Sequence, residues 1–89
     1  MKAIITVTGR DTVGIIAKVS ACCFEVNANI IDITQKVLGD MFVMIMMADI
    51  DGLNIKFTDF VDKMTALGEK EGLVIHTMHE DIFNAMHNI

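Results

Sequence analysis

Residues 41–49 constrain the fold of this 89-residue chain more than any other segment, because they are apolar at nearly every position. The run is too short to cross a bilayer, which takes about 18 consecutive apolar residues. It follows Gly39-Asp40, a pair typical of a two-residue hairpin turn in which glycine supplies a positive φ. We therefore expect residues 41–49 to form a central strand of an antiparallel sheet, covered on both faces.

Three more strands and two helices surround this segment in the sequence. Residues 2–8 and 73–79 are rich in strand-forming side chains, and residues 30–38 form the other arm of the hairpin. Apolar residues recur at three- and four-residue spacing over 13–26 and again over 53–67, which predicts two amphipathic helices. The order is therefore strand, helix, strand, strand, helix, strand.

This order matches the ferredoxin-like split βαβ plan, in the α+β class. Right-handed crossovers place both helices on one face of a four-stranded antiparallel βαββαβ sandwich, with strand order 4-1-3-2. We expect one domain over residues 1–80 and a short helical tail over 81–89, where apolar residues again recur at helical spacing. The sheet face without helices and the 53% apolar content together predict a homo-oligomer.

Local signals mark where the elements end. Asp11 or Thr12 is a candidate N-cap for the first helix, Asn54 is a candidate cap for the second, and Gly72 suits its C-terminal stop. In the strand over 30–38, simple alternation places Ile31 and Ile33 on one face.

Charge and targeting signals narrow the functional classes. The chain has 12 acidic and 7 basic residues, and the basic ones are scattered, so the clustered positive charge that binds nucleic acid is absent. The N-terminus shows no signal peptide, and no segment predicts a membrane span. Cys22 and Cys23 are adjacent and lie in a helical pattern. We expect them to be reduced thiols packed in the interior. We therefore expect a cytoplasmic protein.

Metal binding and catalysis are both disfavoured. The first loop lacks the Cys-x-x-Cys pair of small metal carriers, and His76 and His79 fall on opposite faces of a strand. Arg10 precedes a helix start, as in acylphosphatases, but the Gln and Phe-Arg of their loop are missing. No Ser-His-Asp or Cys-His arrangement can be placed. We expect no enzyme activity, no metal and no cofactor.

Three stretches of the chain together resemble one known family. They are Gly9-Arg10-Asp11-Thr12-Val13-Gly14-Ile15 with its continuation Ile16-Ala17-Lys18-Val19, Asn29-Ile30-Ile31-Asp32-Ile33-Thr34-Gln35, and Phe42-Val43-Met44-Ile45-Met46-Met47. From Lys2 to about Glu80 the chain resembles the ACT domain, a small regulatory module that binds amino acids. It looks closest to stand-alone bacterial ACT proteins similar to the ACT repeats of the glycine cleavage system repressor. Val13 departs from many ACT loops, which carry proline there.

The resemblance implies an amino-acid site in an oligomeric sensor. ACT dimers typically pair strand 2 with its twin, which brings the first loop of one subunit to the start of strand 2 of the other. Free N–H groups at the helix start suit a carboxylate, Asp11 suits an ammonium group, and Asn29 suits either group. The implied ligand-binding residues are Gly9, Arg10, Asp11, Thr12, Val13, Gly14 and Ile15, with Asn29 from the second subunit.

A structural role for the same residues stays open beside this interpretation. Asp11 or Thr12 can serve only as a cap, worth about 1 kcal/mol, and Gly14 and Asn29 can serve only packing and turns. The alternative function is accordingly a ligand-free dimerisation or docking module for an unidentified protein partner.

Overall fold

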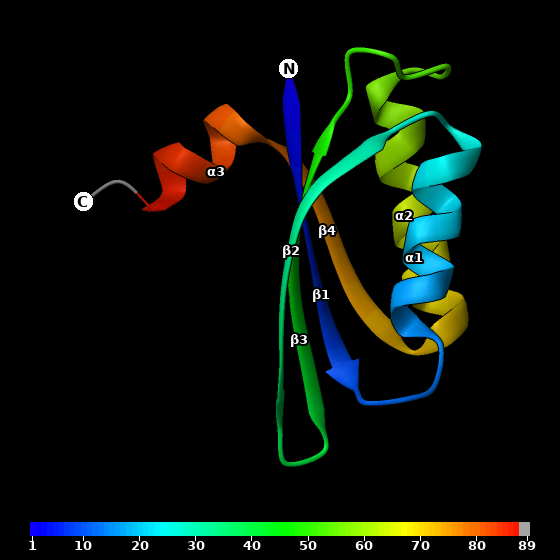
Figure 1. Ribbon diagram of the computed structural model, residues 1–89, viewed down its shortest axis with the longest axis vertical. Helices are drawn as coiled ribbons and strands as arrows, with labels where there is room; N and C mark the ends of the chain where they lie inside the picture. The colour runs from blue at the N-terminus through cyan, green and yellow to red at the C-terminus, as the bar shows by residue number, and fades with distance from the viewer. Residues whose placement is uncertain (88–89) are drawn as a thin grey trace.

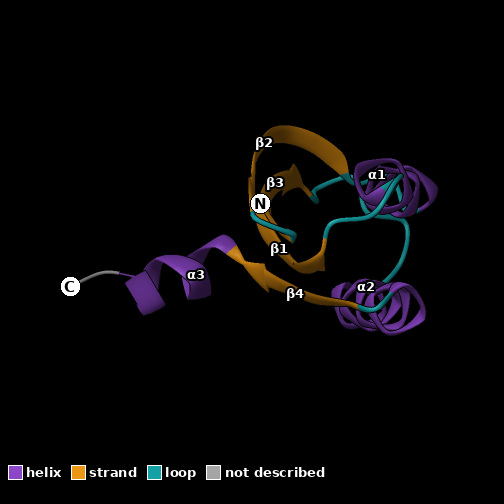
Figure 2. Ribbon diagram, turned by 90° about the horizontal axis from the view of Figure 1, so that it is seen from below, coloured by secondary structure: helices purple, strands orange, loops and turns teal. Residues whose placement is uncertain are grey.

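The computed structural model describes residues 1–87 as four strands and three helices. In chain order they are β1 (Lys2–Arg10), α1 (Ile15–Glu25), β2 (Asn29–Leu38), β3 (Met41–Asp49), α2 (Phe57–Glu71), β4 (Leu73–His79) and α3 (Glu80–His87). The strands form one antiparallel sheet of order β2-β3-β1-β4. Both α1 and α2 lie on one side of this sheet, as Figures 1 and 2 show. The predicted ferredoxin-like fold and strand order are confirmed.

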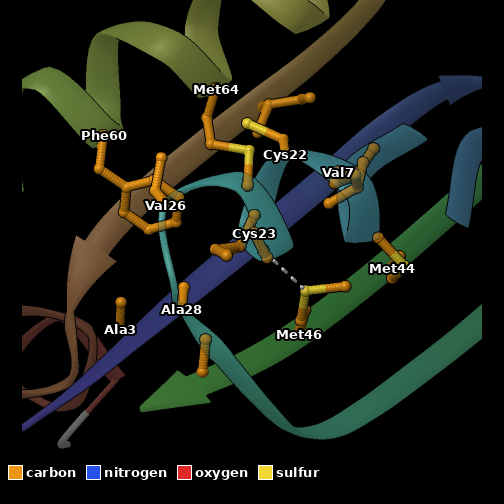
Figure 3. Close-up of a cluster of buried hydrophobic side chains, with 14 of the residues drawn as sticks. Ala3, Val7, Cys22, Cys23, Val26, Ala28, Met44, Met46, Phe60 and Met64 are labelled. Carbon is orange, nitrogen blue, oxygen red and sulfur yellow. Dashed lines mark hydrogen bonds between the residues drawn. The ribbon is translucent and has the colours of Figure 1, made fainter. Parts of the chain in front are cut away.

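The core fills the space between the sheet and these two helices. Every second residue of β3 is buried there, and the pairing of β3 with β1 sets buried residues of both strands side by side. Figure 3 shows how the two helices close over them. The largest fully buried side chains are Phe60, Ile5, Met44, Met46, Met64, Val7, Val19 and Cys23.

Sulfur atoms meet inside this core. Cys23 Sγ lies 3.9 Å from Met46 Sδ, a weak contact drawn as the dashed line in Figure 3. Burial raises the pKa of Cys23 to about 12 and also raises the pKa of Cys22. Both thiols are free and buried, which agrees with the packed thiols expected from the sequence.

The side of the sheet without α1 and α2 is an open face. Its apolar centre is formed by Met41, Val43, Ile45 and Met47 of β3, which alternate with the buried residues of that strand. Met41 and Ile45 are 46% and 42% exposed. The predicted central position of β3 is confirmed, whereas a single chain covers only one of the strand's two faces.

The start of α1 differs from the sequence prediction. The N-cap is Gly14, in the left-handed region at φ 86°, and no side chain caps the helix. The prediction of Asp11 or Thr12 as the cap is therefore wrong. A glycine adopts this conformation without the steric cost of a Cβ, so the backbone turns into the helix at Gly14, two or three residues later than expected.

Asn54 caps a different helix from the one predicted. The N-cap of α2 is Lys56, again without a side-chain hydrogen bond. Asn54 Nδ2 instead donates to the Glu25 carbonyl at 3.2 Å, and the Asn54 N–H donates to the Val26 carbonyl at 3.0 Å. Both bonds serve the C-terminal end of α1, where carbonyls lack partners within the helix. Gly72, at φ 72°, ends α2 as expected.

A register shift interrupts β2. It lies between Ile30 and Asp32, opposite β3. Ile30 and Ile33 both pack against the core, while Ile31 is exposed. The prediction that Ile31 and Ile33 share a face is wrong, because a bulge inserts an extra residue and resets the alternation.

The C-terminal tail is helical. Figures 1 and 2 show α3 leaving the end of β4 and projecting away from α1 and α2. The predicted tail over 81–89 thus corresponds to α3, although residues 88–89 lie outside the described part of the chain. The division into a domain over 1–80 and a separate tail stays a prediction.

We predict that Phe60→Ala lowers the free energy of unfolding by about 3–5 kcal/mol, because Phe60 is fully buried and its loss leaves a cavity. Phe24→Ala is the matched control: Phe24 is 86% exposed, so its loss changes stability by about 0.5 kcal/mol or less. Urea unfolding at one protein concentration measures both. Similar losses for the two variants would contradict the assigned core.

Candidate functional site

A cavity of about 430 Å³ opens between the start of α1 and the β2–β3 hairpin. Figure 1 places the β1–α1 loop at the same end of the sheet as the hairpin turn. The cavity is therefore bordered by segments that are distant in sequence. It is lined by Asp11, Thr12, Gly14, Ile15, Ile16 and Ala17 on one side and by Gln35, Lys36, Val37 and Phe42 on the other.

Backbone hydrogen bonds hold the loop beside the cavity. The Asp11 N–H donates to the Asp40 carbonyl at 2.8 Å, which ties the loop to the hairpin turn. At the other end of the loop, the Gly14 carbonyl accepts from the Lys18 N–H at 3.0 Å, which starts α1. The loop is thus fixed without its side chains.

The first turn of α1, which begins at Ile15, borders this cavity, and its backbone carries N–H groups. Such groups have no acceptor within the helix, and no side chain caps them here. The partial positive charge of a helix N-terminus favours a negatively charged group at this position. Asp11 and the first turn of α1 both border the cavity, so an acidic residue lies beside N–H groups of a kind that suits an anion.

The hairpin supplies an amide and an apolar surface. In the register of β2 with β3, Gln35 pairs with Met44 and Val37 pairs with Phe42. Met44 and Phe42 are buried beneath the helices, so Gln35 and Val37 lie on the cavity side of β2. Lys36 alternates with them and pairs with Val43 of the open face. Gln35 is therefore a polar residue that β2 places on the cavity side, and Lys36 also borders the cavity.

Four of the eight residues implied by the resemblance line this cavity: Asp11, Thr12, Gly14 and Ile15. Gly9 and Arg10 instead end β1, where they pair with Phe42 and Met41. Val13 is 96% exposed and lies outside the lining.

Gly9 has a packing role. A Cβ there would lie 2.7 Å from Leu73 Cδ2 and 3.2 Å from the Gly72 carbonyl oxygen. The close approach of β1 to the junction of α2 and β4 thus leaves little room for a side chain at Gly9.

Asn29 lies at the opposite end of β2 from the cavity. It pairs with Asp49, whereas residues 35–37 of the same strand line the cavity. At about 3.3 Å per residue, six residues of strand separate Asn29 from Gln35 by about 20 Å. Asn29 of the same chain therefore does not reach the cavity, and its contribution from a second subunit stays a prediction.

The sequence interpretation missed the hairpin side of the cavity. Residues 16, 17, 35–37 and 42 are absent from the implied ligand-binding residues, although residues 16, 17, 35 and 42 lie within the motifs that carry the resemblance. Counting outward from the Gly39-Asp40 turn pairs Val37 with Phe42. This pairing is the sequence signal that could have indicated the hairpin side of the cavity.

The side chains able to ligate metals are dispersed over residues 1–87. No three His, Cys, Asp or Glu side chains gather there to hold a metal ion. The His79 ring packs 4.2 Å from the Phe57 ring, while His76 pairs with Thr6 on the open-face side. Among these residues, no helix is long and apolar enough to cross a membrane.

A model of the ACT domain family matches residues 2–77. The chain belongs to this family. A UPF0237 protein of Listeria innocua is 42% identical to this ACT domain over 89 residues, which is 100% of both chains. A solved ACT domain protein from Streptococcus pneumoniae is 38% identical, with a TM-score of 0.81 over 93% of each chain.

The fold is also shared with a larger regulator. A structure described as a glycine cleavage system transcriptional repressor matches 89% of this ACT domain and 47% of that chain. Its TM-score is 0.71 at 24% identity, so the match shows a common fold. The resemblance inferred from the sequence motifs is confirmed.

We predict that Gly14→Ala destabilises this ACT domain by about 1–2 kcal/mol, because an L-residue is strained in the left-handed region. The added Cβ would meet only Lys18 Cε, at 3.9 Å, so crowding contributes little. Gly14→Asn should cost less, since Asn tolerates this conformation. Thermal unfolding measures both, and equal stability of Gly14→Ala and the unmodified protein would exclude the assigned cap.

Proposed function

We propose that this ACT domain is a regulatory sensor that binds a small zwitterion, an amino acid above all, in the cavity beside α1. The observation that carries the proposal is the uncapped start of α1 facing a cavity that also holds Asp11 and Gln35. One end of that cavity suits a carboxylate, and the Asp11 carboxylate suits an ammonium group.

In the proposed complex, the two sides of the cavity contact different groups of the ligand. Its carboxylate accepts hydrogen bonds from N–H groups of residues 15–17, and its ammonium group donates to Asp11. The amide of Gln35 can donate or accept beside them. The ligand's own side chain packs on the apolar lining from Ile16, Val37 and Phe42.

We propose further that a second subunit completes the site through its Asn29. β2 is an edge strand, so its outer backbone N–H and C=O groups are available for pairing. Pairing two such edges about a two-fold axis extends the sheet to eight strands and creates two equivalent sites. Exposed Val13 and Ile31 support contact of these regions with another chain.

The regulatory role we propose includes no catalysis, no cofactor, and no nucleic-acid or membrane binding, and its location is the cytoplasm. The net charge of −5 supports the proposed absence of nucleic-acid binding. The alternative, a ligand-free dimerisation or docking module, is supported by the exposed apolar residues of the open face.

A thermal-shift screen of the twenty amino acids tests the proposed ligand class, with inorganic phosphate and free purines beside them. An amino acid at about 100 times its dissociation constant should stabilise the protein by about 2.7 kcal/mol. Asp11→Ala and Gln35→Ala should reduce this stabilisation. Asp11 does not cap α1, so its loss should change the melting temperature of the free protein little.

Thr34→Ala is the matched control for Gln35→Ala. Thr34 is the preceding residue of β2, pairs with Ile45 of the open face and lies outside the cavity lining. It should retain the full ligand response. If no amino acid stabilises the protein, the sensor proposal fails and the docking alternative is favoured.

We predict that Asn29→Ala abolishes the ligand-induced stabilisation while leaving the melting temperature of the free protein nearly unchanged. The exposed Asn29 side chain makes no hydrogen bond within the described chain, so its removal costs little stability. Calorimetric titration of the stabilising amino acid measures the loss. Full binding by Asn29→Ala together with loss in Asp11→Ala would show a site formed by one subunit.

A further inference from the structure

The outward face of α1 is apolar, although it borders solvent. Ala17, Ala21 and Phe24 recur at the spacing of one helix face, and all three are exposed. We call these three residues the outer stripe of α1. The opposite face of the helix holds its buried residues, Ile15, Val19, Cys22 and Cys23. α1 is therefore apolar on two opposite faces, as helices covered on both sides are, and the described chain covers only one of them.

The neighbouring helix has an ordinary solvent-exposed face. Figures 1 and 2 show α1 and α2 side by side on the same side of the sheet. The exposed residues of α2 are polar apart from Ala66, namely Thr58, Asp59, Asp62, Lys63, Thr65, Glu69 and Lys70. Since both helices have the same position relative to the sheet, exposure to solvent does not account for the outer stripe of α1. Phe24, at 86% exposed, has the surface expected of a contact with a partner.

A groove between the two helices runs beside the stripe. Its cavity has a volume of about 250 Å³ and is lined by Lys18, Cys22 and Glu25 of α1 and by Lys63, Ala66, Leu67 and Lys70 of α2. Two ion pairs cross it. The Lys18 ammonium lies 3.0 Å from Glu71, and the Lys63 ammonium lies 2.9 Å from Glu25. Lys18 and Glu25 therefore mark the side of α1 that faces α2, next to the outer stripe.

This groove is positively charged in an acidic protein. Its three lysines are Lys18, Lys63 and Lys70, whereas the whole chain has only 7 basic residues and a net charge of −5. Lys70 has no carboxylate partner among residues 1–87, so the lysines outnumber the two glutamates paired with them. The two ion pairs are partly exposed to solvent and therefore weak. An acidic group of a partner is thus favoured at this position.

We propose that the outer stripe of α1 docks an acidic amphipathic helix of another protein. The apolar face of that helix packs on Phe24 and the two alanines, and its acidic flank faces the lysines of the groove. Because Ala17 and Ala21 are small, the two helix axes can approach to about 8 Å, the close end of the usual range. Ala17 also borders the amino-acid cavity, so the docked helix ends beside it. Docking itself requires no ligand in that cavity.

Fluorescence anisotropy of two labelled synthetic peptides tests the proposal on the full chain, with no amino acid added. Both peptides have about 20 residues, enough for helix formation, and the same leucine face. One carries glutamate and the other lysine at the remaining polar positions. The net charge of −5 alone would favour the lysine peptide. We predict instead that the glutamate peptide binds at least about tenfold more tightly, and that added salt reduces this preference.

Paired variants locate the binding surface. Phe24→Ala should weaken binding of the glutamate peptide by about tenfold or more, since exposed aromatic anchors dominate small interfaces. Val74→Ala is its control, because Val74 is an exposed apolar residue of the open face, and it should bind normally. Lys70→Glu should weaken binding by about threefold to tenfold. Lys2→Glu changes the net charge equally on β1 and should have little effect.

Other outcomes would overturn the proposal. They are tighter binding of the lysine peptide, no binding of the glutamate peptide at about 1 mM, and a loss of binding in Val74→Ala but not in Phe24→Ala. Light scattering provides a further test. A lower mass for Phe24→Ala than for the unmodified protein would show that a second copy covers the stripe. Because no amino acid is present, each of these results leaves the sensor proposal to its own thermal-shift test.

Discussion

The backbone pairing of β3 with β1 on one edge and β2 on the other is the interaction on which the rest of the molecule depends. It runs the length of β3 and brings its alternate side chains against α1 and α2. The same pairing fixes the hairpin, and the hairpin register decides that Gln35 and Val37 lie across from the start of α1. The locations of the core, the cavity and the open face thus all follow from the position of β3 in the sheet.

Periodicity explains why the fold could be predicted from the sequence. Helical spacing, the Gly39-Asp40 turn and the apolar β3 segment each specify a local structure, and few topologies satisfy all three. The failures share another cause. Asn54 bonds to Glu25, 29 residues away, and the shift in β2 depends on its pairing with β3. Neither the hydrogen bond of Asn54 nor the register shift of β2 can be inferred from the local sequence pattern.

The candidate site was only half predictable for the same reason. Motif reasoning found the loop through Asp11 and Gly14, because a glycine and polar residues before a helix form a local signature. It could not assign the opposing wall at Gln35, which is 24 positions from Asp11 and meets the loop only through the fold. The proposed role of Asn29 requires a second chain, so no local sequence pattern could indicate it.

The two buried cysteines of α1, Cys22 and Cys23, can report on motions of the protein. A thiol reacts with alkylating reagents as its thiolate, and burial of Cys23 leaves scarcely any thiolate at neutral pH. Modification must therefore wait until α1 lifts from the sheet. Cys22, on the same helix, provides a second site for alkylation and is slightly less buried than Cys23. The two cysteines form a native reporter of how often this domain opens, without any added label.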